Sequence, residues 1–94
     1  MKALVFGTGL IGTSVALALR ASGAQVWLSD SDEGTAKLAA ELGAGTFVPD
    51  LRDAKGLADV AVLAMPPEAV APALSFAQEN GVADVYTDVA SVKV

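Results

Sequence analysis

The sequence predicts an α/β fold in which helices cover both faces of a doubly wound parallel sheet. Short apolar runs alternate with helix-like runs along all 94 residues, and glycine or proline separates the two kinds of segment. The apolar runs are continuous rather than alternating, as is typical of strands buried on both faces. Because right-handed crossovers join such strands, we expect one domain over residues 1–94 with all strands ending along one edge.

The first strand is expected at Lys2–Phe6 and the first helix at about Ile11–Ser22, with a glycine-rich turn between them. The turn places Gly7, Gly9 and Gly12 in the pattern G-x-G-x-x-G. The first glycine permits a tight turn, the second lets a pyrophosphate approach the backbone, and the third permits close packing of helix on strand. The start of the helix attracts an anion through its free N–H groups and dipole.

This strand, turn and helix predict a Rossmann-like dinucleotide-binding site. The residues assigned to its phosphate-binding turn are Gly7, Thr8, Gly9, Leu10, Ile11 and Gly12. The alternative is that the glycines serve only an ordinary turn.

The second strand, Gln25–Ser29, ends at Asp30. An acidic residue at this place accepts hydrogen bonds from the ribose hydroxyls and repels the 2′-phosphate of NADP. No arginine follows, since the next residues are Ser31, Asp32 and Glu33, so the sequence favours NAD over NADP. We assign Asp30 and Ser31 to the cofactor site and expect Asp32 to cap the next helix.

The helices are expected to lie on the sheet through small residues. Ala16, Ala18 and Ala21 are predicted to face the sheet from the first helix, with Leu17 and Leu19 adding bulk around them. The second helix, Glu33–Leu42, is predicted to face inward through Ala36, Leu38, Ala39 and Leu42. A short third strand is expected at Thr46–Val48, and residues 50–57 are expected to form a loop or a short helix.

A further buried strand is expected at Asp59–Met65, followed by a helix that begins at two prolines and ends near Asn80, and by a last strand at Asp84–Thr87. Loops at the carboxyl ends of parallel strands form the ligand crevice in such sheets. We therefore assign Met65, Pro66 and Pro67 to the cofactor site. The alternative is that the prolines only start the helix.

Composition narrows the class of protein. Hydrophobic residues make up 53% and charged residues 18%, which indicates a folded chain. With a net charge of -5 and no basic cluster, we expect no nucleic-acid partner, and no apolar run is long enough to predict a membrane partner. The chain has neither cysteine nor histidine, so we assign no metal site; the lack of cysteine fits a cytoplasmic location.

Three motifs resemble those of one enzyme family: Gly7–Ser14, Ala64–Pro67 and Thr87–Lys93. Through them the chain resembles the N-terminal dinucleotide-binding domain of the prephenate dehydrogenase family. The last motif is the most specific, although Ala90 stands where that family usually has glycine. The motifs together span nearly the whole chain.

The resemblance implies NAD-dependent oxidative decarboxylation of prephenate, or of arogenate, in tyrosine biosynthesis. It places Ser91 as the catalytic candidate beside the nicotinamide and the substrate hydroxyl; alternatively, Ser91 caps a helix that begins at Val92. The family's catalytic histidine and its helical dimerisation domain lie beyond these residues. We therefore expect a sheet truncated before that C-terminal domain, inactive alone and part of a homodimeric enzyme.

Two other functions share parts of this pattern. Another β-hydroxyacid or imine dehydrogenase or reductase also opens with the glycine turn, but the segment Asp88–Lys93 argues against it. A non-enzymatic nucleotide sensor of potassium transport also needs no histidine. The prolines after Met65 and the motif around Ser91 resemble the dehydrogenase better.

Overall fold

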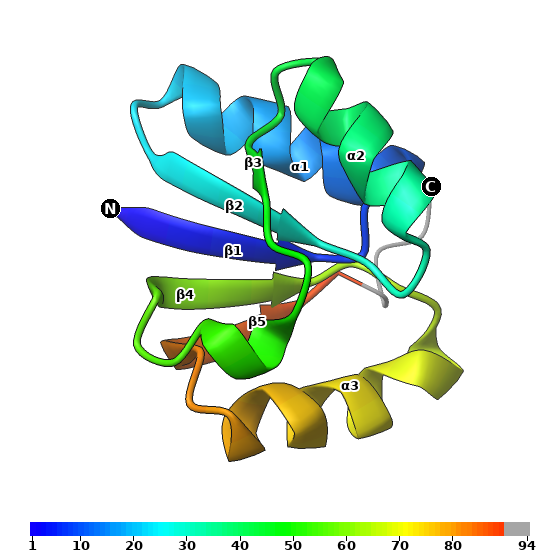
Figure 1. Ribbon diagram of the computed structural model, residues 1–94, viewed down its shortest axis with the longest axis vertical. Helices are drawn as coiled ribbons and strands as arrows, with labels where there is room; N and C mark the ends of the chain where they lie inside the picture. The colour runs from blue at the N-terminus through cyan, green and yellow to red at the C-terminus, as the bar shows by residue number, and fades with distance from the viewer. Residues whose placement is uncertain (90–94) are drawn as a thin grey trace.

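The computed structural model describes residues 1–89, which form a five-stranded sheet with helices on both sides (Figure 1). The strands are β1 (Lys2–Phe6), β2 (Gln25–Ser29), β3 (Thr46–Phe47), β4 (Ala58–Leu63) and β5 (Ala83–Asp88). Their order is β3-β2-β1-β4-β5, and all pairings are parallel. The order reverses between β1 and β4, which is where such sheets open a crevice at their carboxyl ends.

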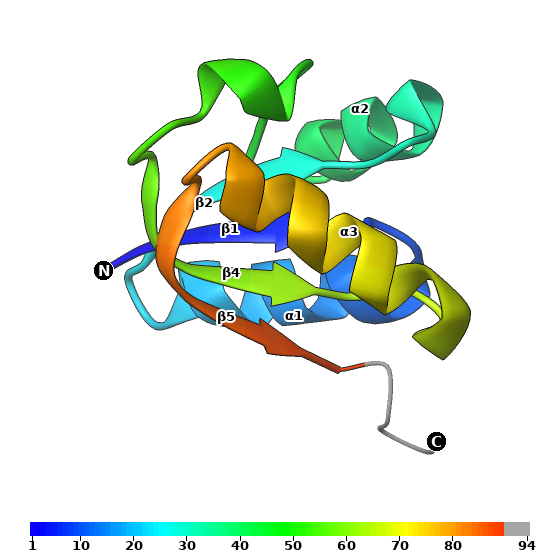
Figure 2. The ribbon, with the colours of Figure 1, turned by 90° about the horizontal axis from the view of Figure 1, so that it is seen from below.

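The helices are α1 (Leu10–Ala21), α2 (Glu33–Glu41) and α3 (Pro67–Glu79), with a short 3-10 helix, η1 (Leu51–Asp53). Helices α1 and α2 cover one face of the sheet, and α3 and η1 cover the other (Figures 1 and 2). The neighbouring residues Leu4 and Val5 of β1 belong to two different core clusters because successive strand residues face opposite sides. The predicted doubly wound α/β fold is confirmed.

Helix α1 meets the sheet along a stripe that differs from the predicted one. Gly12 and Ala16 are buried, as four-residue spacing on a helix requires. Ala18 and Ala21 are exposed, so their predicted inward position was wrong. Leu19 packs beside the buried cluster, as predicted.

Helix α2 also rests on alanines, but its leucines do not face the core. Ala36 and Ala39 are buried as predicted, whereas Leu38 is 57% exposed and Leu42 is 64% exposed. Those two predictions were wrong because only a narrow stripe of α2 meets the sheet. The Asp32 side chain accepts hydrogen bonds from the N–H groups of Gly34 and Thr35, which confirms the predicted cap.

Strand β4 ends at Leu63, earlier than the predicted Met65. Its last pairing with β1 joins Leu63 to Phe6, and the Ala64 N–H then donates to the Phe6 carbonyl at 2.8 Å as the chain leaves the sheet. This departure frees the segment after Leu63 to lie over the ends of the strands. Strand β5 forms the edge on this side of the sheet.

Candidate cofactor crevice

Three adjoining hollows of about 510, 410 and 490 Å³ lie at the carboxyl ends of the strands. Asp30 and Ser31 line both the first and the second hollow. Gly9, Met65 and Pro66 line both the second and the third. These shared walls make one continuous crevice, so the structure brings together the turn after β1, the end of β2 and the loop after β4.

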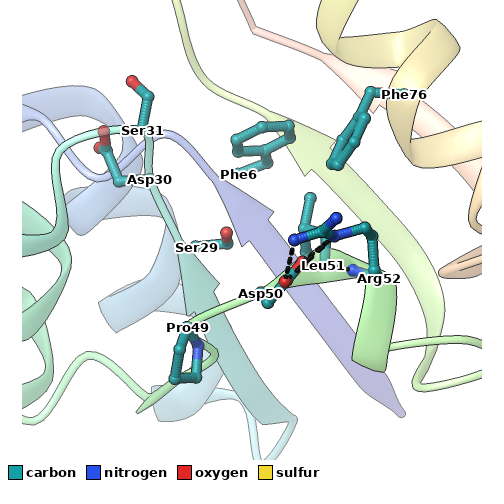
Figure 3. Close-up of a pocket in the computed structure, with 9 residues that line it drawn as sticks. All are labelled: Phe6, Ser29, Asp30, Ser31, Pro49, Asp50, Leu51, Arg52 and Phe76. Carbon is teal, nitrogen blue, oxygen red and sulfur yellow. Dashed lines mark hydrogen bonds and ion pairs between the residues drawn. The ribbon is translucent and has the colours of Figure 1, made fainter.

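The first hollow is partly aromatic and partly charged (Figure 3). Asp30 and Ser31 lie at one end of it in this view, and Phe76 and Arg52 lie at the other. The Arg52 guanidinium donates three hydrogen bonds to the Asp50 carboxylate at 2.7 to 3.1 Å. These hydrogen bonds lower the pKa of Asp50 and raise the pKa of Arg52, so both groups are charged at neutral pH.

The three glycines of the turn have different surroundings. Gly7 has a positive φ of 101°, and a side chain there would collide with the Ala64 carbonyl oxygen. A side chain at Gly12 would collide with the Gly7 carbonyl oxygen. A Cβ at Gly9, in contrast, would meet nothing within 4 Å. The fold itself therefore requires glycine at positions 7 and 12, while Gly9 leaves open space against the backbone for a ligand.

The first turn of α1 offers hydrogen-bond donors to that space. Gly9 is the N-cap residue of α1, and it supplies no side-chain cap. The N–H groups of Leu10, Ile11 and Gly12 have no acceptor within the helix because they belong to its first turn. A helix that starts without a side-chain cap, next to the exposed backbone of Gly9, fits a phosphate group.

Asp30 is fixed by three hydrogen bonds at the end of β2. Its Oδ2 accepts from the Thr8 N–H at 2.6 Å and from the Thr8 hydroxyl at 2.8 Å, and its Oδ1 accepts from the Asp32 N–H at 2.8 Å. Burial raises the pKa of this carboxyl, but hydrogen bonds from the Asp32 and Thr8 backbones and from the Thr8 and Ser31 hydroxyls lower it below its ordinary value. The carboxylate is therefore negatively charged at neutral pH.

The predicted site residues fall into three groups. Those that line the second or third hollow are Gly7, Gly9, Leu10, Ile11, Asp30, Ser31, Met65 and Pro66. Thr8, Gly12 and Pro67 line none of these three hollows. Ser91 lies outside the described residues, so its catalytic role stays a prediction.

Sequence reasoning missed several lining residues. Phe6, Arg52 and Phe76 line the first hollow, and Ala73 lines the second. No motif marks these positions, since they come from the end of a strand, a short 3-10 helix and the middle of α3. The Thr8 contact with Asp30 was also missed, although a threonine between two glycines was visible in the turn.

Comparison with known proteins identifies the family. The family model of the prephenate dehydrogenase nucleotide-binding domain matches residues 15–94, most of the chain. This chain belongs to the prephenate dehydrogenase family. It is 42% identical over 92 residues to the probable prephenate dehydrogenase NovF of Streptomyces niveus, a match that covers 98% of this chain and 24% of that protein.

Solved structures agree with the family assignment. The arogenate dehydrogenase of Synechocystis superposes with a TM-score of 0.85 at 33% identity, covering 100% of this chain and 34% of that one. An imine reductase of Streptomyces aurantiacus gives a TM-score of 0.75 at 21% identity over 97% of this chain and 32% of its own, a likeness of fold alone. This prephenate dehydrogenase family domain thus spans about a third or less of each of these three proteins.

The family assignment makes this chain a nucleotide-binding domain of an oxidoreductase family that acts on small molecules. It favours the dehydrogenase over the nucleotide sensor that sequence reasoning had kept as an alternative. A separate finding concerns membranes: within residues 1–89, no helix is both long and apolar enough to cross a bilayer.

Proposed function

We propose that this chain binds NAD as the N-terminal domain, residues 1–94, of a prephenate dehydrogenase. The whole enzyme would be a cytoplasmic homodimer that oxidatively decarboxylates prephenate, or arogenate, in tyrosine biosynthesis. The observation that carries the cofactor assignment is the ionised Asp30 carboxylate, held against the glycine turn at the edge of the crevice. The family match and the likeness to an arogenate dehydrogenase support the reaction.

In this proposal the crevice holds the cofactor along its length. The backbone of Gly9 and the first N–H groups of α1 receive the pyrophosphate. Asp30 and Ser31 receive the adenosine ribose, and the loop of Met65, Pro66 and Pro67 lies on the nicotinamide side. Bound NAD would supply the acceptor for a hydride from the substrate.

The residues of this chain would bind, orient and shield the cofactor rather than move the substrate proton. Oxidation of a hydroxyl needs a base, and these 94 residues contain no histidine. Ser91 remains the candidate for a hydrogen bond to the substrate hydroxyl. We therefore expect no substantial turnover when the purified chain is mixed with prephenate and NAD, and substantial NADH formation would contradict this part of the proposal.

Preference for NAD follows from charge at Asp30. Two unit charges about 4 Å apart near a protein surface interact by about 4 kcal/mol at an effective dielectric constant of 20. This repulsion between the carboxylate and a 2′-phosphate exceeds the gain from a typical hydrogen bond, about 1 kcal/mol. Arg52 lines the first hollow, but its positive charge is already paired with the Asp50 carboxylate and does not offset this repulsion.

Titration calorimetry of the purified chain with NAD and, separately, with NADP tests the proposal. We expect saturable NAD binding, much weaker NADP binding, and loss of this discrimination in Asp30→Ala. Absence of NAD binding to protein shown to be folded by circular dichroism would contradict the proposal, as would unchanged discrimination in the variant.

Asp59→Ala is a matched control. Asp59 also accepts a backbone hydrogen bond, from the Lys2 N–H at 2.9 Å, but it lies where β1 and β4 begin, at the opposite edge of the sheet. We expect the Asp59→Ala variant to bind NAD and NADP with the affinities of the wild type. Melting temperatures of both variants are needed because Asp30→Ala leaves the buried Thr8 donors without their partner.

A further inference from the structure

The hydrogen bonds around Asp30 leave few acceptor positions for a ligand. A carboxylate offers about four lone-pair positions, two on each oxygen. Both positions on Oδ2 are used, by the N–H and the hydroxyl of Thr8, and one on Oδ1 is used by the Asp32 N–H. The remaining position on Oδ1 is the one that a ligand can use, because the Ser31 hydroxyl, which also bonds this carboxyl, belongs to an exposed residue and can rotate away.

Thr8 is itself held in place. It is 2% exposed, and its carbonyl oxygen accepts a hydrogen bond from the Thr13 hydroxyl at 2.8 Å. Thr13 belongs to the first turns of α1, so the chain of contacts runs from α1 through Thr8 to the end of β2. Thr8 lines none of the three hollows of the crevice, so it acts on a ligand there through Asp30.

We propose that Thr8 is a positioning residue for cofactor selectivity: it occupies Oδ2 of Asp30 and leaves Oδ1 to accept one ribose hydroxyl. This inference rests on the proposed function and refines it, since the glycine motif predicts direct contact between Thr8 and the cofactor. A 2′-phosphate brings negative charge and no hydroxyl proton to that position. Discrimination between NAD and NADP therefore depends on a side chain that touches neither.

The neighbouring charges do not replace Thr8 in this role. Asp32 lies on the same loop as Asp30 and caps α2 with its own carboxylate. On the other side of the first hollow, η1 contributes Arg52. The guanidinium of Arg52 is paired with the carboxylate of Asp50, the residue before η1. Thr8 thus supplies both hydrogen bonds to Oδ2 of the Asp30 carboxylate.

The test compares Thr8→Val, which keeps the shape and loses the hydroxyl, with Thr8→Ser, which keeps the hydroxyl. Ser22→Ala is the control because its hydroxyl donates to the Leu19 carbonyl at the far end of α1 and touches neither Thr8 nor the carboxylate. Calorimetric titrations with NAD and NADP give the ratio of the two affinities. We expect Thr8→Val to lower this ratio by about tenfold, the loss typical of one hydrogen bond to a charged group. Thr8→Ser and Ser22→Ala should retain the wild-type ratio.

A second readout needs no nucleotide. Carbon-detected NMR titration of the Asp30 carboxyl should show a higher pKa in Thr8→Val than in the wild type, because a hydrogen bond to the charged form is lost. Thr8→Ser should restore the wild-type value. If Thr8→Val does not fold, Thr8→Ala removes the same hydroxyl with less bulk and takes its place.

The two readouts separate failure of this inference from failure of the proposed function. An unchanged Asp30 pKa in the variant overturns the inference, and so does an unchanged ratio of affinities. If the folded wild type binds no NAD, the proposed function fails, and with it the part of the inference that concerns selectivity. The NMR titration then still decides whether Thr8 controls the carboxylate.

Discussion

The end of the crevice beside β2 has its polar groups paired with one another, whereas the end beside β4 is apolar and leaves large side chains exposed. At the polar end, Thr8 and Asp32 hold the Asp30 carboxylate through three hydrogen bonds. At the apolar end, the third hollow is lined by Gly9, Leu10, Ile11, Ala64, Met65, Pro66 and Val89. Leu10 is 89% exposed there.

In our proposal, this difference assigns cofactor selection to the polar end of the crevice and the reaction to the apolar end. The polar end is organised within the described residues before any ligand arrives, and preorganised charge is what selects between NAD and NADP in our proposal. The lining of the third hollow carries no titratable side chain. Since the chain spans 34% of the arogenate dehydrogenase that it resembles, we expect the base to come from the rest of the proposed enzyme.

The largest effect is expected where the two ends meet, at Gly12. A side chain there collides with the Gly7 carbonyl and reaches Ala64, which lines the second and third hollows. Gly12→Ala should lower the free energy of unfolding by about 3 kcal/mol, at the upper end for overpacking, because the obstacle is backbone. Chemical denaturation followed by circular dichroism measures the free energy of unfolding. If Gly12→Ala were as stable as the wild type, α1 would be able to move away from Gly7 at little cost, against this prediction.

Gly9→Ala should affect binding rather than folding. Its Cβ meets no atom of the protein within 4 Å, so the melting temperature should change little. If the pyrophosphate approaches this backbone, NAD affinity should fall about tenfold or more, as expected when a hydrogen bond to a charged group is lost. Calorimetric titration measures the affinity, and unchanged NAD binding would place the phosphates elsewhere.

The polar end should make stability depend on acid pH. The folded pKa of Asp30 lies below the ordinary value, so its contribution is present above that value and is lost as the pH falls through the folded pKa. We expect the free energy of unfolding to fall less steeply below about pH 4 in Asp30→Asn than in the wild type. Urea unfolding across this range measures the slope. Equal slopes in the two proteins would show that Asp30 does not contribute to stability in this way. Leu10→Ala is the control and should keep the wild-type slope.

The smallest effect is expected at the apolar end. Leu10→Ala removes an exposed side chain, so the free energy of unfolding should change by less than about 0.5 kcal/mol. NAD affinity should fall about threefold, since little apolar contact is lost. ADP-ribose, which lacks the nicotinamide, should bind as tightly as it does to the wild type. An equal loss for both ligands would show that the Leu10 side chain does not contact the nicotinamide.

Three features could be predicted from the residues alone: the succession of strands and helices along the chain, the glycine turn and the Asp32 cap. These features depend on residues close together in the chain, such as Gly7 to Gly12 or Asp32 with Gly34. The periodicity of α2 did not reveal that Leu38 and Leu42 are exposed, because the width of its contact with the sheet depends on how the helix lies there.

The contact between Thr8 and Asp30 could not be predicted from local patterns, since the two residues are 22 positions apart in the chain. Their contact exists because β2 lies beside β1 in the sheet, and the Gly7 N–H donates to the Ser29 carbonyl at the end of that pair. Arg52 reaches the crevice in the same way, through the connection from β3 to β4. Patterns along the chain predict its elements, whereas contacts between their ends depend on the strand order and on the packing of the loops.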